Sequence, residues 1–234
     1  MRRFWNEAAA VGSAGTFRIL LDGRPVRLPG GAILNLSSAG LANAIADEWR
    51  QAGLERDEMS FADVPLTRLA GTAQERIAPD PAPTIKAIAR YAEADLICYR
   101  APRPQGLVRR QARDWQPWLD WAALELDAPL RVTAGVMLVV QPPASLLALS
   151  RAVAAHDPGT LAALGLAVPA TGSLVLGLAL AAGRLDGATA HALSVIDEQF
   201  QVELWGGDAE AEARRRAIGA DISLAARFME LSRL

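Results

Sequence analysis

The hydrophobic periodicity of this chain becomes uniformly helical beyond a segment with three prolines in five residues, Pro79 to Pro83. Before it, apolar side chains such as Phe17, Ile19 and Leu21 alternate with a period of two, which is typical of strands. After it, they recur every three or four residues, which is typical of helices. Clustered prolines indicate a linker. The sequence therefore predicts an α+β fold, with a small β-rich N-terminal domain (residues 1–80) followed by a larger all-helical C-terminal domain (residues 84–234).

The N-terminal domain is expected to contain a short β-meander. Its apolar runs at residues 17–21 and 26–28 are joined by Asp22-Gly23, a dipeptide that favours a tight hairpin turn. A second turn at residues 29–31 precedes a third expected strand at residues 33–36. The meander therefore predicts three strands in hairpin order.

One helix should follow the meander. Ser37 or Ser38 is suited to cap its N-terminus, because a serine hydroxyl accepts a hydrogen bond from the first free amides. Leu41, Ile45 and Trp49 then fall on one helical face. Trp49 is therefore predicted to be a core residue.

Helices are expected over most of the C-terminal domain, because alanine, the strongest helix former, makes up about a fifth of the chain. Residues 136–140 fit either a strand or the start of a buried helix. The expected helices begin at Thr84, cover residues 107–126, 143–183 (with a break near Val168-Pro169) and 186–204, and resume after Asp208.

Two of these helices carry clear core stripes. Trp115, Leu119, Ala122 and Leu126 line one face of the helix at residues 107–126, so Trp115 is predicted to be structural. In the helix at residues 186–204 the predicted core stripe is Leu193, Ile196, Phe200 and Leu204, and Gly206-Gly207 is expected to end that helix.

Composition argues against several classes of function. A net charge of −2 favours neither nucleic acid nor an anionic membrane. Cys98 is the single cysteine, which excludes an internal disulfide, and His156 and His191 lack partners at metal-ligand spacing. No nucleotide-binding or hydrolase motif is present. We expect no catalytic residue, no metal and no cofactor.

The uncharged stretch at residues 158–183 is long enough to cross a bilayer. Its five glycines and its many alanines favour buried helices that pack closely instead. We therefore expect no stable membrane insertion.

Charge is segregated along the C-terminal half. Arginines cluster between Arg100 and Arg113, and acids cluster between Asp197 and Glu212. Such patches orient a protein partner during association, or they pair with each other across the fold. The sequence leaves both interpretations open.

A second stripe lies on the helix at residues 186–204. Glu198, Gln201 and Trp205 are spaced i, i+3 and i+7, so they fall within a band roughly 60° wide, away from the core stripe. A tryptophan ringed by polar groups is typical of a protein-binding surface. The alternative is that Trp205 covers the helix end and packs against the core.

Short motifs in a fixed order resemble the ATP12 family, assembly chaperones of the F1 portion of ATP synthase. The resemblance spans nearly the whole chain. Its pieces are Arg3-Phe4-Trp5, Leu21 to Pro25, Ala46 to Trp49, Pro65-Leu66-Thr67, Asp95-Leu96, Cys98-Tyr99-Arg100, Gln111, Trp115, Gln141-Pro142, Thr171-Gly172-Ser173 and Glu198 through Gln201 to Trp205-Gly206.

The resemblance implies a non-catalytic monomer that binds the unassembled F1 α subunit and shields its subunit interface. It assigns partner binding to Glu198, Gln201 and Trp205, with Asp197 beside them, and structural roles to Trp49, Trp115 and Gly206. The N-terminus lacks an import segment, so a bacterial cytoplasmic location is expected.

Two other functions remain open at this stage. One is a small-molecule enzyme with an interdomain site near Cys98 or His191. The other is a peripheral membrane protein that uses residues 158–183.

Overall fold

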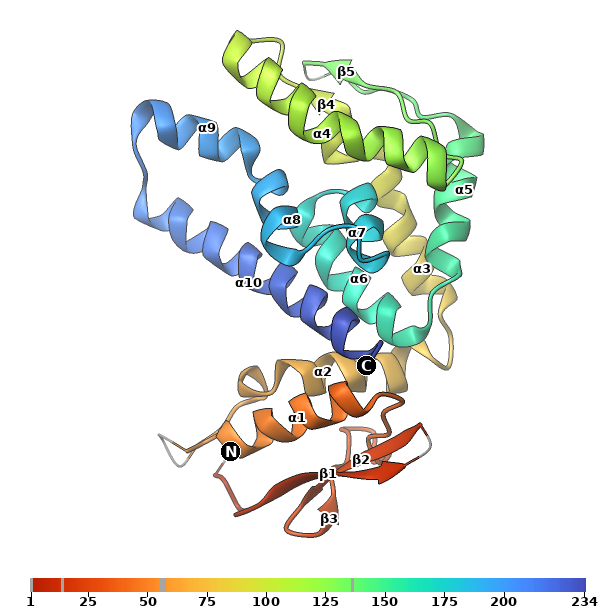
Figure 1. Ribbon diagram of the computed structural model, residues 1–234, viewed down its shortest axis with the longest axis vertical. Coiled ribbons are helices and arrows are strands. Elements are labelled where there is room, and N and C mark those ends of the chain that lie inside the picture. The colour runs from red at the N-terminus through yellow and green to blue at the C-terminus, as the bar shows by residue number, and fades with distance from the viewer. Residues whose placement is uncertain (1, 14, 55–57, 136) are drawn as a thin grey trace. The chain divides into compact units, whose positions relative to one another are not determined.

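The computed structural model describes residues 2–13, 15–54, 58–135 and 137–234 (Figure 1). Two compact units make up the chain. The first comprises Met1–Pro81, Asp157–Ala163 and Arg227–Leu234, and the second comprises Ala82–His156 and Leu164–Ala226. The boundaries at 1–80 and 84–234 stay a prediction. The first unit also contains one segment from the middle of the helical region and one from the C-terminus, and no hydrophobic periodicity indicates that they belong there.

A three-stranded antiparallel sheet forms the N-terminal part of the first unit, in the order β1 (Ala8–Ser13), β2 (Thr16–Leu21) and β3 (Arg24–Pro25). The hairpin at Asp22-Gly23 is confirmed: both residues have positive φ, 46° and 79°, as this turn requires. The α+β prediction is confirmed too, since a helical region follows this small sheet.

Two strand predictions were wrong, and one strand was missed. The strand after the Asp22-Gly23 turn is Arg24–Pro25, ahead of the predicted residues 26–28. Residues 33–36 form only isolated bridges, from Ile33 to Arg27 and from Leu36 to Phe17. The first strand, β1, was missed because its sequence begins with three alanines, which favour a helix locally. Pairing with β2 along its whole length makes this segment a strand.

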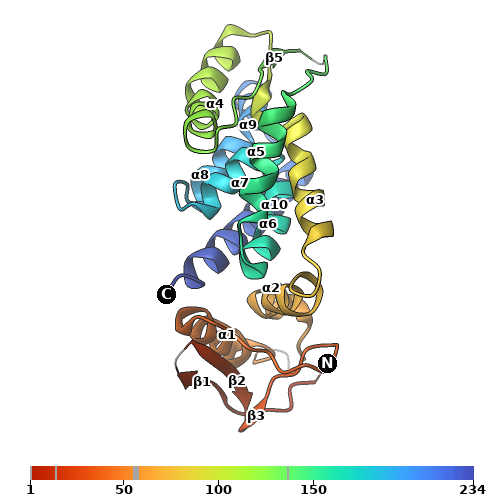
Figure 2. The same cartoon turned by 90° about the vertical axis from the view of Figure 1, so that its right-hand side faces the viewer.

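Helix α1 (Ala39–Gln51) covers the sheet and contacts α2 (Pro65–Thr72), as Figure 2 shows. Ser38 caps α1, because its hydroxyl accepts a hydrogen bond from the Leu41 amide at 3.1 Å. Trp49 is buried as predicted, and its indole N–H donates to the Thr67 hydroxyl at 3.0 Å. A 3₁₀ turn at Phe61–Asp63 (η1) precedes α2, and a π-helical turn at Ala73–Ile77 (η2) extends it.

The remaining elements are helical apart from two short parallel strands. They are α3 (Ala82–Ala89), η3 (Arg90–Ala94), η4 (Leu96–Cys98), β4 (Tyr99–Arg100), α4 (Gln105–Glu125), β5 (Thr133–Ala134), α5 (Pro143–Ala154), α6 (Pro158–Thr171), α7 (Leu174–Ala181), α8 (Gly187–Ser194), α9 (Ile196–Trp205) and α10 (Ala209–Leu231). Every residue of α7 is buried, which explains a helix that is apolar on all sides. Across the described residues, no helix is both long and apolar enough to span a membrane.

Buried Asp95 holds the N-terminus of α7 in place. Its carboxylate accepts hydrogen bonds from the amides of Val175 (3.0 Å) and Ile97 (3.2 Å). The Leu96 amide donates to the carbonyl of Gly172 at 3.0 Å. Hydrogen bonds therefore hold together two motifs that are some 75 residues apart in the sequence, one around Asp95 and one around Gly172.

Several predicted helix boundaries were wrong. α3 begins at Ala82, so Thr84 lies inside the helix. Pro169 also lies inside a helix, α6. The break comes instead at Gly172, which has a φ of 67°, and Ser173 then caps α7.

The predicted helix at residues 186–204 is two helices. Val195, with φ −116° and ψ 22°, separates α8 from α9. Leu204 is 56% exposed, so the predicted core stripe does not extend to the end of α9. Val136, in the ambiguous stretch at 136–140, lies outside the described residues, and residues 137–140 belong to neither a strand nor a helix.

Candidate functional site

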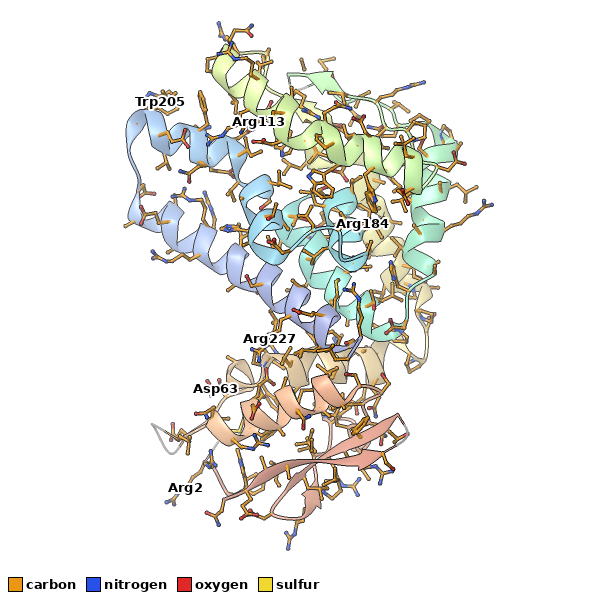
Figure 3. All side chains as sticks on the ribbon, in the orientation of Figure 1. Arg2, Asp63, Arg113, Arg184, Trp205 and Arg227 are labelled. Atoms are coloured by element: carbon orange, nitrogen blue, oxygen red, sulfur yellow. The ribbon has the colours of Figure 1, made fainter. Side chains whose placement is uncertain are left out.

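The exposed face of α9 carries the predicted binding residues. Glu198, Gln201 and Trp205, which we call the α9 stripe, are all exposed. Trp205 is 78% exposed at the C-terminal end of the helix (Figure 3). The interpretation that Trp205 packs against the core is therefore wrong. A large indole is left in solvent beside a carboxylate and an amide.

Contacts from α4 hold α9 at two positions outside the stripe: Glu203 lies on the opposite side of the helix, and Asp197 lies on the flank beside Gln201. The side-chain amide of Gln111 donates to the Asp197 carboxylate at 2.6 Å. One guanidinium nitrogen of Arg110 lies 2.9 Å from both carboxylate oxygens of Glu203. Asp197 is therefore used inside the fold, and it is rotated about 100° from Glu198 around the helix. Its direct contact with a partner stays a prediction.

Gln111 joins three segments. It is fully buried, and its side-chain oxygen accepts a hydrogen bond from the Ala101 amide at 2.7 Å. Its backbone carbonyl accepts one from Arg100 at 2.6 Å. Since its amide group also binds Asp197, this side chain links the chain after β4, helix α4 and helix α9. Both side-chain heteroatoms of Gln111 and its backbone carbonyl therefore have hydrogen-bond partners, and satisfied partners make a buried side chain rigid.

Trp115 supports the end of α8, which leads directly into α9. Its side chain is 1% exposed, and its indole N–H donates to the Leu193 carbonyl at 2.9 Å. The Arg100 guanidinium lies 5.3 Å from the ring centroid, a cation–π distance. The far end of α9 is fixed by Gly206, whose φ of 87° ends the helix.

The charged patches pair with each other in part. Arg110 binds Glu203 of the acidic cluster, whereas Arg113 binds its sequence neighbour Asp114, outside that cluster, at 2.6 Å. Arg100 is half-buried, and desolvation lowers its pKa. Exposed Arg103, Arg109, Glu198 and Glu210 remain at the surface. Pairing across the fold therefore accounts for only some of the segregated charge.

The proposed enzyme residues are poorly placed for catalysis. Burial, with a smaller contribution from the charge of Asp95, raises the pKa of the Cys98 thiol to about 12. The thiolate is the reactive form, so Cys98 is a weak nucleophile at neutral pH. His191 packs closely against Gly219: a Cβ added at Gly219 would lie 3.0 Å from the imidazole ring of His191. Within the described residues, no cluster of His, Cys, Asp or Glu is arranged to hold a metal.

We expect Cys98 to react with a thiol reagent at least a hundredfold more slowly in the native chain than in the urea-unfolded chain. The reason is that both burial and the raised pKa suppress the thiolate. Time-resolved labelling with Ellman's reagent at pH 7.5 measures both rates. Complete labelling of the native chain within minutes contradicts the expectation and favours the enzyme hypothesis.

The second unit thus combines a helical support with an exposed strip of aromatic, amide and acidic side chains. A sequence model of the ATP12 chaperone protein family matches residues 2–123. The chain therefore belongs to the ATP12 chaperone family.

Known relatives agree with this assignment. The structure of Atp12 from Paracoccus denitrificans is 45% identical, with a TM-score of 0.91, covering 99% of this chain and 98% of that one. The Atu1473 protein of Agrobacterium tumefaciens is 36% identical, with a TM-score of 0.87, covering 98% and 85% respectively. The mitochondrial atp12 protein of Schizosaccharomyces pombe is 24% identical over 88% of this chain and 74% of its own length.

Sequence reasoning found the stripe but missed its support. In the sequence, Gln111 stands out only as part of the family motif, and Arg110 only as one residue of the arginine cluster between Arg100 and Arg113. Their partners on α9 are 86 and 93 residues away, so no local pattern reveals the contacts. The one available signal for Gln111 was its place in the family motif.

Proposed function

We propose that this chain is an assembly chaperone for the F1 sector of ATP synthase, and that it binds the unassembled α subunit through the α9 stripe. Family membership supports the chaperone part. The exposed Trp205, beside Glu198 and Gln201, supports the location of the binding surface. The chain is not an enzyme in this proposal, and it acts as a monomer in the bacterial cytoplasm.

The physical role is to cover a subunit interface. An unassembled subunit exposes apolar surface that causes aggregation until its proper partner arrives. A chaperone that covers this surface needs a rigid recognition face, because ordering a flexible face on binding reduces affinity. The α9 stripe meets that need, since α4 holds the flank of the helix through Gln111 and its opposite side through Arg110.

The test is binding of purified F1 α subunit to the full chain, measured by calorimetry and by co-elution. We expect a one-to-one complex. Trp205→Ala should weaken it at least tenfold, because exposed tryptophans that become buried in interfaces carry much of the binding energy. Glu198→Lys should weaken it through reversed charge on the same face.

Glu210→Lys is the matched control, since Glu210 is also an exposed acid but lies on α10, outside the stripe. Both stripe variants should unfold at the same temperature as the unmodified chain, because neither side chain supports the core. Absence of an α-subunit complex contradicts the proposed partner. An intact complex with Trp205→Ala contradicts the proposed surface.

A further inference from the structure

The first unit contains a pocket of about 980 Å³. This volume is at the upper end of the range for ligand pockets, roughly 300–1,000 Å³. Its apolar lining includes buried Leu21, Val26, Leu28 and Trp49, from the sheet side and from α1. The α9 stripe belongs to the second unit, so the pocket is a separate feature.

Two exposed aromatic side chains also line this pocket. Phe4 is 70% exposed and Phe61 is 58% exposed. Solvent-exposed apolar groups at the edge of a cavity are typical of a surface that another molecule covers. The pocket therefore has a buried apolar floor and apolar side chains still open to solvent.

The charged groups of the lining are mainly positive. Arg24, Arg27, Arg68 and Arg76 line the pocket and are exposed, and among the described residues none of them forms a salt bridge. Of the described residues that line it, Glu75 is the one acid. A whole-chain charge of −2 hides this local excess of positive charge.

Glu75 is already used by the fold. Its two carboxylate oxygens accept hydrogen bonds from the Gly30 amide at 3.0 and 3.2 Å. Gly30 suits this contact, because a Cβ there would lie 2.6 Å from a Glu75 oxygen. The carboxylate thus ties the turn after β3 to η2 and does not pair with the four arginines. Arg27 donates from one guanidinium nitrogen to the Gly31 carbonyl at 2.7 Å, and the other N–H groups of its fork stay available to an anionic ligand.

The arginines are spread along the pocket. Arg68 and Arg76 are eight residues apart along α2 and η2, a rise of about 12 Å. Arg24 and Arg27 come from β3 and the segment after it. One small head group cannot reach charges so far apart, whereas an extended peptide covers 12 Å with about four residues. The spacing favours a ligand with several separated negative charges.

We propose that this pocket binds a short acidic segment of a partner protein, whose apolar side chains enter the pocket while its carboxylates pair with Arg24, Arg27, Arg68 and Arg76. Arginine is well suited to this, because its guanidinium forms two parallel hydrogen bonds with a carboxylate. The proposal does not depend on the α subunit, since it concerns a different surface and is tested without that protein.

The probe is a fluorescein-labelled hexapeptide of alternating glutamate and leucine, mixed with the full chain and followed by fluorescence anisotropy at low salt. We expect saturable one-to-one binding that weakens as salt is added. A matched peptide with lysine for glutamate, and another with serine for leucine, should each bind at least tenfold more weakly. Equal binding of all three peptides overturns the proposal.

Variants then locate the site. Arg68→Glu combined with Arg76→Glu should weaken peptide binding at least tenfold, and so should Thr72→Trp, which fills the pocket from α2 without changing its charge. Arg18→Glu is the control, because Arg18 is an exposed arginine on β2 that does not line the pocket. Thermal unfolding checks that each variant remains folded.

Two results would overturn this assignment. One is an equal loss with Arg18→Glu, which would show attraction to net charge alone. The other is one-to-one binding of laurate to the pocket without binding of the peptide, which would indicate a small amphiphile. If the chain binds the α subunit but not the peptide, only this inference is rejected. If the chain binds the peptide but not the α subunit, only the proposed function is rejected.

Discussion

Replacing Trp115 by alanine is expected to lower the free energy of unfolding by about 3–5 kcal/mol, the usual cost of truncating a large buried aromatic side chain. The side chain is 1% exposed, so little solvent is available to fill the cavity. The change also leaves the Leu193 carbonyl without its indole donor and removes the ring beside Arg100. Because Leu193 lies just before α9, the binding helix should loosen along with the core.

Urea unfolding followed by circular dichroism measures this loss. Trp115→Phe is the matched control: it keeps most of the apolar volume and removes the hydrogen bond, so it should cost about 1 kcal/mol. If the alanine variant fails to fold, the phenylalanine variant still tests the hydrogen bond. A loss below 1 kcal/mol with alanine would contradict the structural role of Trp115.

The second large effect is a pH dependence that comes from Asp95. Burial raises the pKa of this carboxyl from 3.8 to about 6, although the amides of Val175 and Ile97 donate to it and oppose the shift. The folded state therefore binds a proton more readily than the unfolded state. As pH falls from 7.5 to 4.5, Asp95 should add about 2 kcal/mol to the free energy of unfolding.

The sign follows from the two pKa values. This contribution is fully present below the unfolded pKa, near 4, and it is lost as pH rises through the folded pKa, near 6. Glu48 has a raised pKa as well, and Asp157 has a lowered one, so the pH profile of the whole chain is a sum over several groups.

Comparison with Asp95→Asn isolates the one group. The asparagine does not titrate, and the other groups contribute equally to both proteins. Urea unfolding of each protein at pH 7.5 and at pH 4.5 should show the unmodified chain gaining about 2 kcal/mol relative to the variant on acidification. A difference between the two proteins that stays constant with pH would show that burial does not shift the Asp95 pKa.

Part of the candidate site could be predicted from the sequence, because its geometry lies within one helix. Glu198, Gln201 and Trp205 lie on one face wherever α9 is placed, since helical spacing alone aligns them. The direction of that face was not predictable. It depends on how α4 packs against α9, and the sequence pattern wrongly placed Leu204 in the core.

The sequence by itself determined features that depend on neighbouring residues. The Asp22-Gly23 turn, the Ser38 cap and the buried face of α1 all follow from backbone preferences and helical spacing over a few residues. Only the tertiary structure decided the features that depend on distant partners. It made a strand of the alanine-rich Ala8–Ser13, joined Gln111 to Asp197, and enclosed an arginine-lined pocket in the first unit. The physical reason is that packing between distant segments supplies free energies larger than local propensity, and no local pattern records which segments meet.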